Sequence, residues 1–463
     1  MDTKPQIKIL DAVHCKANAK ARKLILPCLT VKIATREKTK YGTVPGTGTK
    51  SLITGYNGSA GIFLTGFLPK IKKYCKKNEI KIKIKGMEEK IVPETKSPKL
   101  KGITFRNNQI KAIKKACRKG RGQIVFPTGS GKTIIALGLF LCFKSSVRLF
   151  LCHTNDIYDQ TIAELKKYKL KHYEITTKSN WDEIKKKKSC ILISKVQSFA
   201  RINIDNYIDF IDMVIVDEVH HVNKEDSQYG KILKHMLAPI RIGLTATIDP
   251  NKLKALIAEG LFGPIIYELS IKEGVELGQI VKPKINLEAV PYDIRINKKG
   301  NYKFKDLYKY GIVENRARNR IIANIAKEEV DKNNIVLILI EKIEHGERIK
   351  KALARKNIKA PFVHGGTKRE IRTEVKNKLI NKKINIAIAS RVWKEGINIP
   401  SLNHIINAAG YKDEKGVLQA LGRGLRPDKN KSMITLTDFC DPYRFLAEHS
   451  IFRIQIYIQK GWL

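Results

Sequence analysis

The residues that decide the fold of this chain run from Gln123 to Thr133 and read QIVFPTGSGKT. The first four form a short apolar run typical of a buried strand, and an apolar helix is predicted to follow at 134–143. Between them, closely spaced glycines let backbone N–H groups surround a phosphate, and the start of a helix adds partial positive charge. The stretch therefore predicts a strand, a phosphate-binding loop and a helix in immediate succession.

The polar residues of this loop suit a nucleotide. Lys132 is long enough to reach the β- and γ-phosphates of ATP, and the hydroxyl of Thr133 is placed to bind Mg²⁺. Phe126 stands where the general pattern has its first glycine. A glycine-rich turn without a ligand is the alternative, but the strand–loop–helix order favours a nucleotide. The loop residues predicted to bind it are Thr128, Gly129, Ser130, Gly131, Lys132 and Thr133.

A second motif supplies carboxylates. The run VIVDEVHH spans 214–221, and its three apolar residues predict a buried strand that ends at Asp217 and Glu218. Parallel α/β folds bind ligands at this end of their strands. Asp217 can hold Mg²⁺ through water, and Glu218 can orient and deprotonate an attacking water. A capped helix start would look similar, but together with the phosphate loop the pair predicts hydrolysis of ATP.

The wider pattern predicts the fold class. Short apolar runs rich in β-branched residues alternate with helical stretches from about 101 to 280, and the alternation repeats from about 284 to 463. We predict two tandem α/β domains with parallel sheets, at 99–283 and 284–463. Residues 1–98 differ, with glycine-rich turns, a basic helix at 68–75 and an isoleucine–lysine alternation at 80–85. They predict a small basic α+β domain, here called the N-terminal module.

Composition limits the partners. The 463 residues include 89 Lys and Arg against 44 Asp and Glu, a net charge of +45. Such an excess favours a polyanion such as nucleic acid, although a general lysine bias would also raise it. No run offers the roughly 20 apolar residues of a membrane span. The eight cysteines are scattered without a CxxC pair, which favours free thiols in the cytoplasm over zinc or disulfides.

The motifs in order resemble those of superfamily 2 helicases, with the sequence DEVH as a DExH box. FRNNQ at 105–109 resembles the adenine-reading element, which implies nucleotide contacts by Arg106 and Gln109. RIGLTAT at 241–247 resembles motif III, and KEGINIP at 394–400 resembles motif V. The resemblance implies two RecA-like domains, and it implies that the residues coupling ATP to movement are Thr245, Thr247 and Gly396.

QALGRGLRP at 419–427 resembles motif VI of the same family. Arg423 and Arg426 lie three residues apart and would share one helix face. Arginines from a second domain can stabilise the charge that builds on the γ-phosphate during transfer. With Gln419, they are predicted to complete the catalytic site, so that ATP closes the two domains and hydrolysis releases them.

Contacts to a nucleic-acid strand also follow from the resemblance. In the family, loops after the strands of both domains line a groove and mostly touch the backbone, which suits sequence-independent tracking. For each single residue, a polar loop group without a ligand is an equal alternative. The predicted contact residues are His153, Thr154, Lys195, Gln197, Lys342, His345, His364, Ser390 and Arg391.

A narrower resemblance is to UvsW-type phage recombination helicases. It is based on GIFLTGFLPKI at 61–71, on EHG at 344–346, and on HS at 449–450 followed by Arg453 and Tyr457. It implies a monomeric, ATP- and Mg²⁺-dependent DNA helicase of the cytoplasm that remodels branched DNA, with 3′ to 5′ movement. The DEVH box and Ala420 argue against DEAD-box RNA proteins, and Asn398 departs from the usual aspartate of motif V.

Three alternatives remain open at this point. The motor motifs would look much the same in the translocating subunit of a restriction complex, although the sequence offers no convincing PD-(D/E)xK nuclease cluster. An RNA-remodelling helicase is the second. The third concerns residues 1–98, which would be a structural cap on the first α/β domain rather than a DNA-binding module.

Overall fold

A computed structural model describes residues 4–39, 42–56, 58–86, 90–222, 226–249, 251–293, 303–390, 393, 399–412, 431 and 433–463, with backbone only for the strand residues among 35–45. The chain divides into two compact units. The first contains Met1–Phe126 and Gly131–Leu269, and the second contains Ser270–Leu463 together with the short segment Pro127–Ser130. The two units are described separately below.

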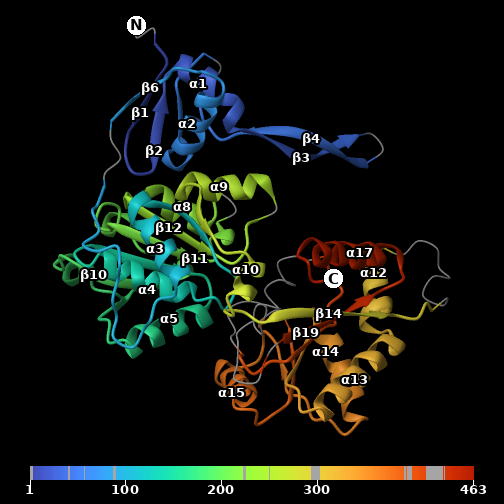
Figure 1. The fold of residues 1–463 in the computed structure, drawn as a ribbon. Coiled ribbons are helices and arrows are strands. Elements are labelled where there is room, and N and C mark those ends of the chain that lie inside the picture. The colour runs from blue at the N-terminus through green and yellow to red at the C-terminus, as the bar shows by residue number, and fades with distance from the viewer. Residues whose placement is uncertain are drawn as a thin grey trace. The chain divides into compact units, whose positions relative to one another are not determined.

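The N-terminal module is built on a four-stranded sheet in the order β5-β2-β1-β6 (Figure 1). Its strands are β1 (Gln6–Ile9), β2 (His14–Ala17), β5 (Gly61–Leu64) and β6 (Lys83–Lys85), and its helices are α1 (Ala19–Ile25) and α2 (Leu68–Lys77). The predicted basic helix is confirmed, with proline in its first turn. The predicted alternating strand is shorter than expected and keeps only its last three residues.

A ribbon of two long antiparallel strands, β3 (Thr30–Thr39) and β4 (Gly42–Ser51), leaves the body of the module. Within the described chain these two strands pair only with each other (Figure 1). The side chain of Arg22 fastens the segment that follows the ribbon, because its guanidinium donates to the carbonyl oxygens of Thr54, Gly55 and Tyr56. Arg22 is thereby buried despite its charge.

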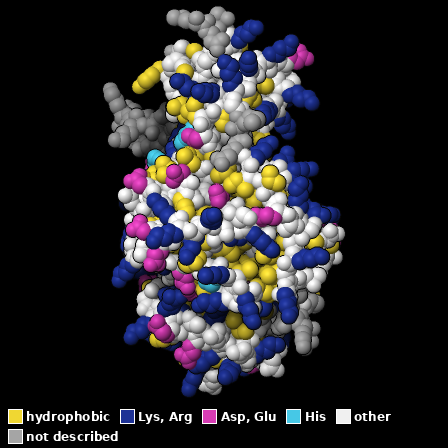
Figure 2. All heavy atoms as spheres, turned by 90° about the vertical axis from the view of Figure 1, so that its left-hand side faces the viewer, with side chains coloured by type: hydrophobic (Ala, Val, Ile, Leu, Met, Phe, Trp, Pro, Cys, Tyr) yellow, Lys and Arg dark blue, Asp and Glu magenta, His cyan; other side chains and the backbone are white. Residues whose placement is uncertain are grey.

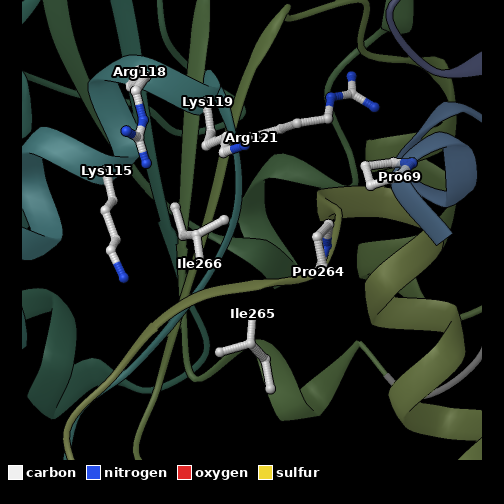
Figure 3. A pocket seen from close by; sticks show the side chains of 8 residues that line it. All are labelled: Pro69, Lys115, Arg118, Lys119, Arg121, Pro264, Ile265 and Ile266. Carbon is white, nitrogen blue, oxygen red and sulfur yellow. The ribbon is translucent and has the colours of Figure 1, made fainter. Parts of the chain in front are cut away.

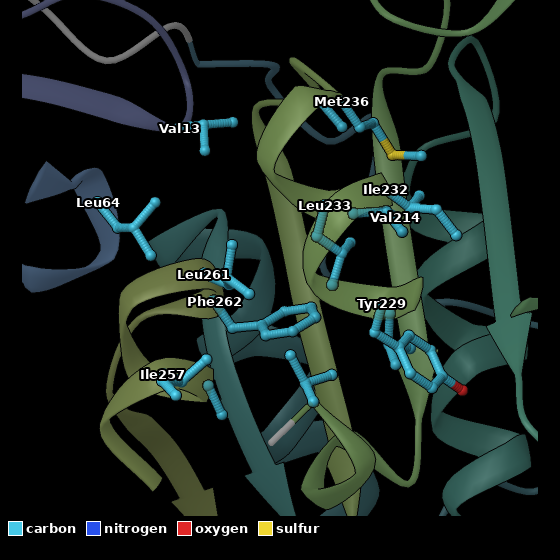
Figure 4. Packing of buried hydrophobic residues seen from close by; sticks show 14 of the residues in the cluster. Val13, Leu64, Val214, Tyr229, Ile232, Leu233, Met236, Ile257, Leu261 and Phe262 are labelled. Atoms are coloured by element: carbon cyan, nitrogen blue, oxygen red, sulfur yellow. The ribbon is translucent and has the colours of Figure 1, made fainter. Parts of the chain in front are cut away.

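The module packs directly on helix α9 (Lys252–Phe262) of the following layer. The 3-10 turn η2 (Thr65–Phe67) approaches so closely that a Cβ at Gly66 would lie 2.4 Å from the carbonyl oxygens of Glu259 and Gly260. Apolar side chains from both sides, including Leu64, Leu261 and Phe262, form one hydrophobic cluster (Figure 4). The structure therefore joins the predicted 1–98 segment and the first α/β layer in one compact unit.

That first α/β layer is a sheet of seven parallel strands in the order β13-β7-β12-β11-β8-β10-β9. The strands are β7 (Arg121–Val125), β8 (Val147–Cys152), β9 (Tyr173–Glu174), β10 (Cys190–Lys195), β11 (Met213–Asp217), β12 (Ile240–Thr245) and β13 (Ile265–Glu268). Strands β7, β8, β10, β11 and β12 coincide with the short apolar runs from which this part was predicted, and β7, β8, β11 and β12 are buried along their whole length. The two edge strands were not predicted, because they are short and partly exposed.

Helices cover both faces of this sheet. They are α3 (Asn107–Lys119), α4 (Lys132–Cys142), α5 (Asn155–Lys167), α6 (Trp181–Lys185), α7 (Val196–Phe199), α8 (Gln228–His235) and α9, with 3-10 turns η3 (Ile204–Asn206) and η4 (Val219–His221). The buried Arg241 joins α8 and α9, since its guanidinium donates to the carbonyl oxygens of Leu233, Met236 and Leu261 near the ends of these helices. A cation at helix C-termini opposes the partial negative charge there.

The second unit contains a six-stranded parallel sheet in the order β14-β19-β18-β15-β17-β16. The strands are β14 (Lys282–Ala289), β15 (Val336–Leu339), β16 (Phe362–Val363), β17 (Ile386–Ala389), β18 (His404–Asn407) and β19 (Met433–Cys440). The helical segments are α10 (Ile271–Glu276), α12 (Phe304–Tyr308), η5 (Lys309–Val313), α13 (Arg316–Asp331), α14 (Ile343–Ala354), α15 (Arg369–Ile380) and α17 (Arg444–Gln459). The two-sheet α/β architecture predicted from the sequence is confirmed.

The boundary between the two units falls after Leu269, fourteen residues before the predicted 283/284 boundary, which would cut strand β14. The division into three domains remains a prediction. Within the second unit, Asp438 is buried and accepts hydrogen bonds from the side chains of Arg453 and Tyr457, at 2.7 and 2.5 Å. These two residues, quoted above for the narrower resemblance, therefore hold α17 against strand β19.

The surface reflects the excess of basic residues in the sequence. Lys and Arg side chains are spread over the whole face drawn in Figure 2. Among the described residues, no helix has the length and hydropathy needed to cross a membrane. All eight cysteines are free thiols.

Candidate nucleotide site and strand-contact loops

The motif loops lie in one row because of the strand order. Strands β7, β12 and β11 are neighbours, with β12 in the middle. The phosphate loop follows β7, Thr245 ends β12, and Asp217 ends β11. All three strands are parallel, so their carboxyl ends meet at one edge of the sheet. Residues more than a hundred positions apart in the sequence thereby meet.

The phosphate loop has the backbone shape that its glycines allow. Gly129 and Gly131 have φ of 86° and 99°, in the left-handed region that favours glycine. A Cβ at Gly131 would also lie 2.4 Å from Nε2 of Gln109. The Ser130 hydroxyl is buried and donates to the Pro127 carbonyl at 2.6 Å. Both φ angle and space therefore require glycine at 131.

The predicted adenine-reading glutamine supports this loop. Oε1 of Gln109 accepts a hydrogen bond from the backbone N–H of Arg106 at 3.0 Å, which ties the start of helix α3. Its Nε2 donates to the Gly131 carbonyl at 3.5 Å. Gln109 is buried, while the side chain of Arg106 is exposed. Gln109 thus ties the start of helix α3 to the phosphate loop, and its contact with a base stays a prediction.

Lys132 and Glu218 face each other at this edge. Nζ of Lys132 lies 3.7 Å from Oε1 of Glu218 and donates to the Phe126 carbonyl at 3.4 Å. Both side chains are largely shielded from solvent, with exposures of 10% and 15%. A weakly solvated ammonium beside a glycine loop is a strong partner for phosphate oxygens. The lysine is therefore poised to exchange its contact with Glu218 for one with an anion.

The pKa values of the two acids of the DExH box shift in opposite directions. Burial, reinforced by the neighbouring Glu218 carboxylate, raises the pKa of Asp217. Burial would also raise the pKa of Glu218, but the Lys132 ammonium and the His220 ring hold that pKa well below its usual range. Glu218 therefore stays ionised at neutral pH. Asp217 is the acid that a cation at this edge would return to its charged form.

Glu218 also has a strained backbone. Its φ of 53° and ψ of 55° put a non-glycine residue in the left-handed region. Such conformations cost about 1–3 kcal/mol and gather at functional sites. The turn directs the Glu218 carboxylate toward His220, whose Nδ1 lies 3.3 Å from Oε2. The strain is consistent with a catalytic carboxylate held by its surroundings.

His220 connects the DExH box to motif III, a role that sequence reasoning did not assign. Its Nδ1 lies 3.1 Å from Oγ1 of Thr245, and that hydroxyl lies 2.7 Å from the carbonyl oxygen of Thr247. In the sequence, His220 is part of the DEVH motif, and nothing there indicated its partner. The pairing of β11 with β12, which brings 220 and 245 together, is the information that the sequence lacked.

Aromatic rings continue from this point to the next loop. The ring of His221 stacks on that of His153 at 4.5 Å between centroids, and it meets the ring of His220 in a tilted contact at 4.4 Å. His153 follows strand β8, which neighbours β11. Gln197, after β10, donates from Nε2 to the His153 carbonyl at 3.0 Å. Two of the predicted strand-contact residues are therefore in direct contact.

The other two predicted contacts in this unit have local partners. The Thr154 hydroxyl caps helix α5 by accepting from the Ile157 N–H at 3.3 Å. Nζ of Lys195 donates to Oδ1 of Asn155 at 2.8 Å. Together with His153 and Gln197, they lie at the ends of the neighbouring strands β8 and β10, and we call this group the strand-contact loops after their predicted role.

In the second unit, the predicted contacts Lys342, His364 and Ser390 follow the neighbouring strands β15, β16 and β17. Lys342 is exposed, His364 is half-buried and Ser390 is buried. His345 does not suit a strand contact, because it is fully buried and its Nε2 lies 2.9 Å from Oδ1 of Asn319. Its place on the inner face of α14 makes it a packing residue between α14 and α13.

Five predicted site residues lie outside the described residues. They are Arg391 and Gly396 of motif V and Gln419, Arg423 and Arg426 of motif VI. Their roles stay predictions.

The residues at the carboxyl edge fit a Mg²⁺–nucleotide complex. Thr133 is the second residue of helix α4, at the end of the phosphate loop, and Asp217 is a buried carboxylate on the strand two places away. Among the described residues, no group of three or more His, Cys, Asp or Glu could hold a metal by itself. Mg²⁺ commonly uses one or two protein oxygens and completes its shell with phosphates and water. When bound, it would neutralise charge on the β- and γ-phosphates.

Comparison with known proteins agrees with this geometry. Residues 102–250 match the family model described as "Type III restriction enzyme, res subunit", and residues 317–428 match "Helicase conserved C-terminal domain". The chain is 26% identical to the DNA 3'-5' translocase XPB2 of Sulfurisphaera tokodaii, over 79% of this chain and 87% of that protein. It is 24% identical to the ATP-dependent DNA helicase uvsW of Enterobacteria phage T4, over 72% and 71% of the two chains.

Among solved structures, the helicase domain of Pyrococcus furiosus Hef aligns with a TM-score of 0.51 at 13% identity, over 74% of this chain and 97% of that one. This likeness supports the fold. Two parallel-sheet domains with a phosphate loop, a DExH box and a linked motif III define an ATP-hydrolysing helicase. The chain is a DExH-box helicase of superfamily 2 that resembles the UvsW-type helicases.

Proposed function

We propose that this helicase uses ATP hydrolysis to move along DNA and to unwind or branch-migrate branched DNA, such as forks, Holliday junctions and displacement loops, in recombination, repair or replication. The observation that carries the proposal is the row of loops at one sheet edge, where Lys132 and Glu218 lie 3.7 Å apart and His220 joins Glu218 to Thr245. DNA as the track is supported by the relatives, whose names describe DNA helicases and translocases, and by the net charge of +45.

In the proposed cycle, Gln109 and Arg106 hold the base of ATP while the loop Thr128–Thr133 and Lys132 hold its phosphates. Glu218 is ionised at neutral pH, so it can orient the attacking water and accept its proton as the γ-phosphate leaves. Arg423, Arg426 and Gln419 are proposed to stabilise the developing charge from the second unit. Closure on ATP and release after hydrolysis would then move the strand-contact loops along the backbone.

A pair of substitutions tests the site. Glu218→Gln keeps the size of the side chain but removes the proton acceptor, so we expect DNA-stimulated turnover to fall at least about 100-fold, with ATP still bound. Lys132→Ala should weaken ATP binding itself, which filter binding or fluorescence of a labelled nucleotide would measure. Glu347→Gln, an exposed acid on α14, is the matched control and should turn over ATP like the parent. Full turnover by a folded Glu218→Gln protein would contradict the assignment.

The track is tested by a panel of nucleic acids. Forks, Holliday junctions, displacement loops, plain duplexes and single-stranded RNA would each be compared for stimulation of ATP hydrolysis and for strand release. Branched DNA should give the strongest release. Stronger stimulation by RNA would favour the RNA-remodelling alternative instead. Directional substrates with one labelled duplex at each end would test the proposed 3′ to 5′ movement.

A second candidate is the motor subunit of a restriction complex, because the first matched family model bears that name. ATP- and Mg²⁺-dependent cleavage of plasmid DNA by the purified chain would favour it. A monomeric state and a cytoplasmic location, the host cytoplasm if the chain is phage-encoded, are further parts of the proposal and rest on the resemblance. Sedimentation at several protein concentrations would test the first.

A further inference from the structure

A cavity of about 350 Å³ lies where the N-terminal module meets the first α/β layer, and we call it the seam pocket. Pro69, at the start of module helix α2, forms one wall, and Lys115, Arg118 and Lys119 of helix α3 line another. Figure 3 shows Lys115 and Arg118 extending from α3 on one side, with Pro69 on the other side and Pro264 between them. The eight lining residues of the described chain include four cations and no acid.

The cations of the seam pocket are concentrated on one face of a helix. Lys115, Arg118 and Lys119 follow the spacing i, i+3 and i+4, so their side chains are neighbours. Like charges at these spacings repel one another and destabilise a helix. The dipole of α3 accounts for positive charge at Arg118 and Lys119, in its last turn. Lys115 lies before that turn, with its Nζ 5.2 Å from the centroid of the Tyr267 ring, and Arg121 lies beyond the helix.

Arg121 makes the pocket a fixed feature of the fold. Its side chain is buried and donates to the carbonyl oxygen of Ala12 in the module. The same arginine opens strand β7 in the first α/β layer. On the module side, η2 runs into α2 and is seated against α9 at Gly66. The two walls of the seam pocket are therefore held at a set separation.

The seam pocket is separate from the nucleotide site. It lies at the amino end of β7, whereas the phosphate loop follows the carboxyl end of the same strand. Five residues of strand span roughly 16 Å. An anion in the seam pocket would thus be distinct from the phosphates of ATP and from a strand held by the loops at the carboxyl edge.

Positive charge continues from the pocket along the module. Helix α2 begins beside Pro69, and its exposed lysines extend away from the pocket: Lys72, Lys73, Lys76 and Lys77. Lys70, nearer the seam, is instead paired with Glu259 at 3.2 Å. A small anion would use only the pocket, whereas a polyanion would use the pocket and the lysine strip together. The strip therefore favours an extended phosphodiester chain.

We propose that the seam pocket seats the phosphodiester backbone of a DNA duplex arm, with Lys115, Arg118 and Lys119 as the phosphate ligands. The inference rests on the proposed function and adds the place where the duplex is gripped. Phosphate contacts position a duplex without reading its sequence, which suits a motor that acts on any branch. The duplex arm would be held at the seam while the strand-contact loops at the opposite edge hold the tracked strand.

The test compares two double variants with the same loss of charge on the same helix. Lys115→Ala/Arg118→Ala removes two lining cations, and Lys111→Ala/Lys114→Ala removes two exposed cations of α3 that do not line the pocket. Affinity for a blunt 30-base-pair duplex and for a single strand is measured without ATP at several salt concentrations. The pocket variant should bind the duplex about tenfold more weakly, with a salt slope reduced by about 1.8 for two lost contacts.

Single-strand affinity and basal ATP hydrolysis should change less than about threefold in both variants. A third variant, Ile265→Glu, adds an acid to the pocket wall without removing a cation and should act in the same direction. Equal duplex affinity in the pocket and control variants would overturn the inference. Binding of pyrophosphate or a free nucleotide at the pocket that leaves duplex affinity unchanged would also overturn it. If the unmodified protein binds duplex but DNA does not stimulate its ATP hydrolysis, the result would instead count against the proposed function alone.

Discussion

Gly66→Ala tests how firmly the N-terminal module is joined to the first α/β layer. The added methyl group would lie 2.4 Å from two backbone carbonyl oxygens, those of Glu259 and Gly260 on α9. Real Cβ contacts are essentially never shorter than 3.0 Å, so η2 must move away from α9 by at least about 0.6 Å, the difference between the two distances. Rotating a side chain cannot relieve the clash, because both oxygens belong to a helix backbone.

The cost of this movement follows from packing. Overpacking a well-ordered core costs about 1–3 kcal/mol, and here it also loosens Leu64 and Phe67 from Leu261 and Phe262. Every 1.4 kcal/mol is a factor of ten, so the seam should open roughly 5 to 150 times more often. Hydrogen exchange followed by mass spectrometry would detect this as faster exchange in peptides covering 61–77 and 252–263. Because Pro69, which lines the seam pocket, lies two residues after η2, duplex affinity should fall as well.

Gly365→Ala is the control, since a Cβ there meets nothing within 4 Å. Gly260→Ala provides an intermediate case, because its Cβ would meet the side chains of Leu64 and Phe67 at 2.8 Å instead of backbone. Exchange at the seam that is equal in Gly66→Ala and Gly365→Ala would refute the reasoning. It would mean that the module rests on the α/β layer without close packing.

Two further predictions concern the site and the second unit. Thr245→Val keeps the shape of the residue but removes the hydroxyl that contacts His220 and Thr247. The stimulation of ATP hydrolysis by DNA should therefore drop at least about fivefold. A normal stimulation ratio in steady-state assays would contradict this link. Burial, with Arg318 and Arg348 nearby, lowers the pKa of His345 well below its ordinary 6.5. The His345 ring therefore stays neutral in the folded protein, while in the unfolded chain it takes up a proton. As a result, the free energy of unfolding of the second unit should fall by up to about 1.4 kcal/mol per pH unit below 6.5. His345→Gln should remove that part of the slope in urea unfolding followed at pH 5–7, and an unchanged slope would argue against it.

Deleting residues 1–90 is a poor test of the module's role, although the module looks separable in the sequence. The deletion would expose the apolar face of α9 that packs against Leu64 and Phe67. Loss of activity would then report unfolding as readily as loss of DNA binding. The structure supports a cap-like role for the module, and this role is compatible with a duplex grip at the seam. Surface variants in the seam pocket separate the two effects.

The sequence by itself was enough for the motor fold and the core of the nucleotide site. Fully buried parallel strands must be apolar along their length, so β7, β8, β10, β11 and β12 were visible as short β-branched runs. Glycines with positive φ at 129 and 131, and acids at a strand end, are local requirements that the sequence records directly. Edge strands such as β9 and β13 were missed because they are short and partly exposed.

Only the tertiary structure could decide which distant residues meet. Strand order places Thr245 between the phosphate loop and Asp217, and it brings His220 to Thr245 and His221 to His153. His345 was predicted as a strand contact, but the structure buries its side chain, which makes it a packing residue. The sequence alone does not show which face of a helix other elements cover. The seam pocket has the same origin, since Pro69 and Lys115 become neighbours only through the packing of η2 on α9.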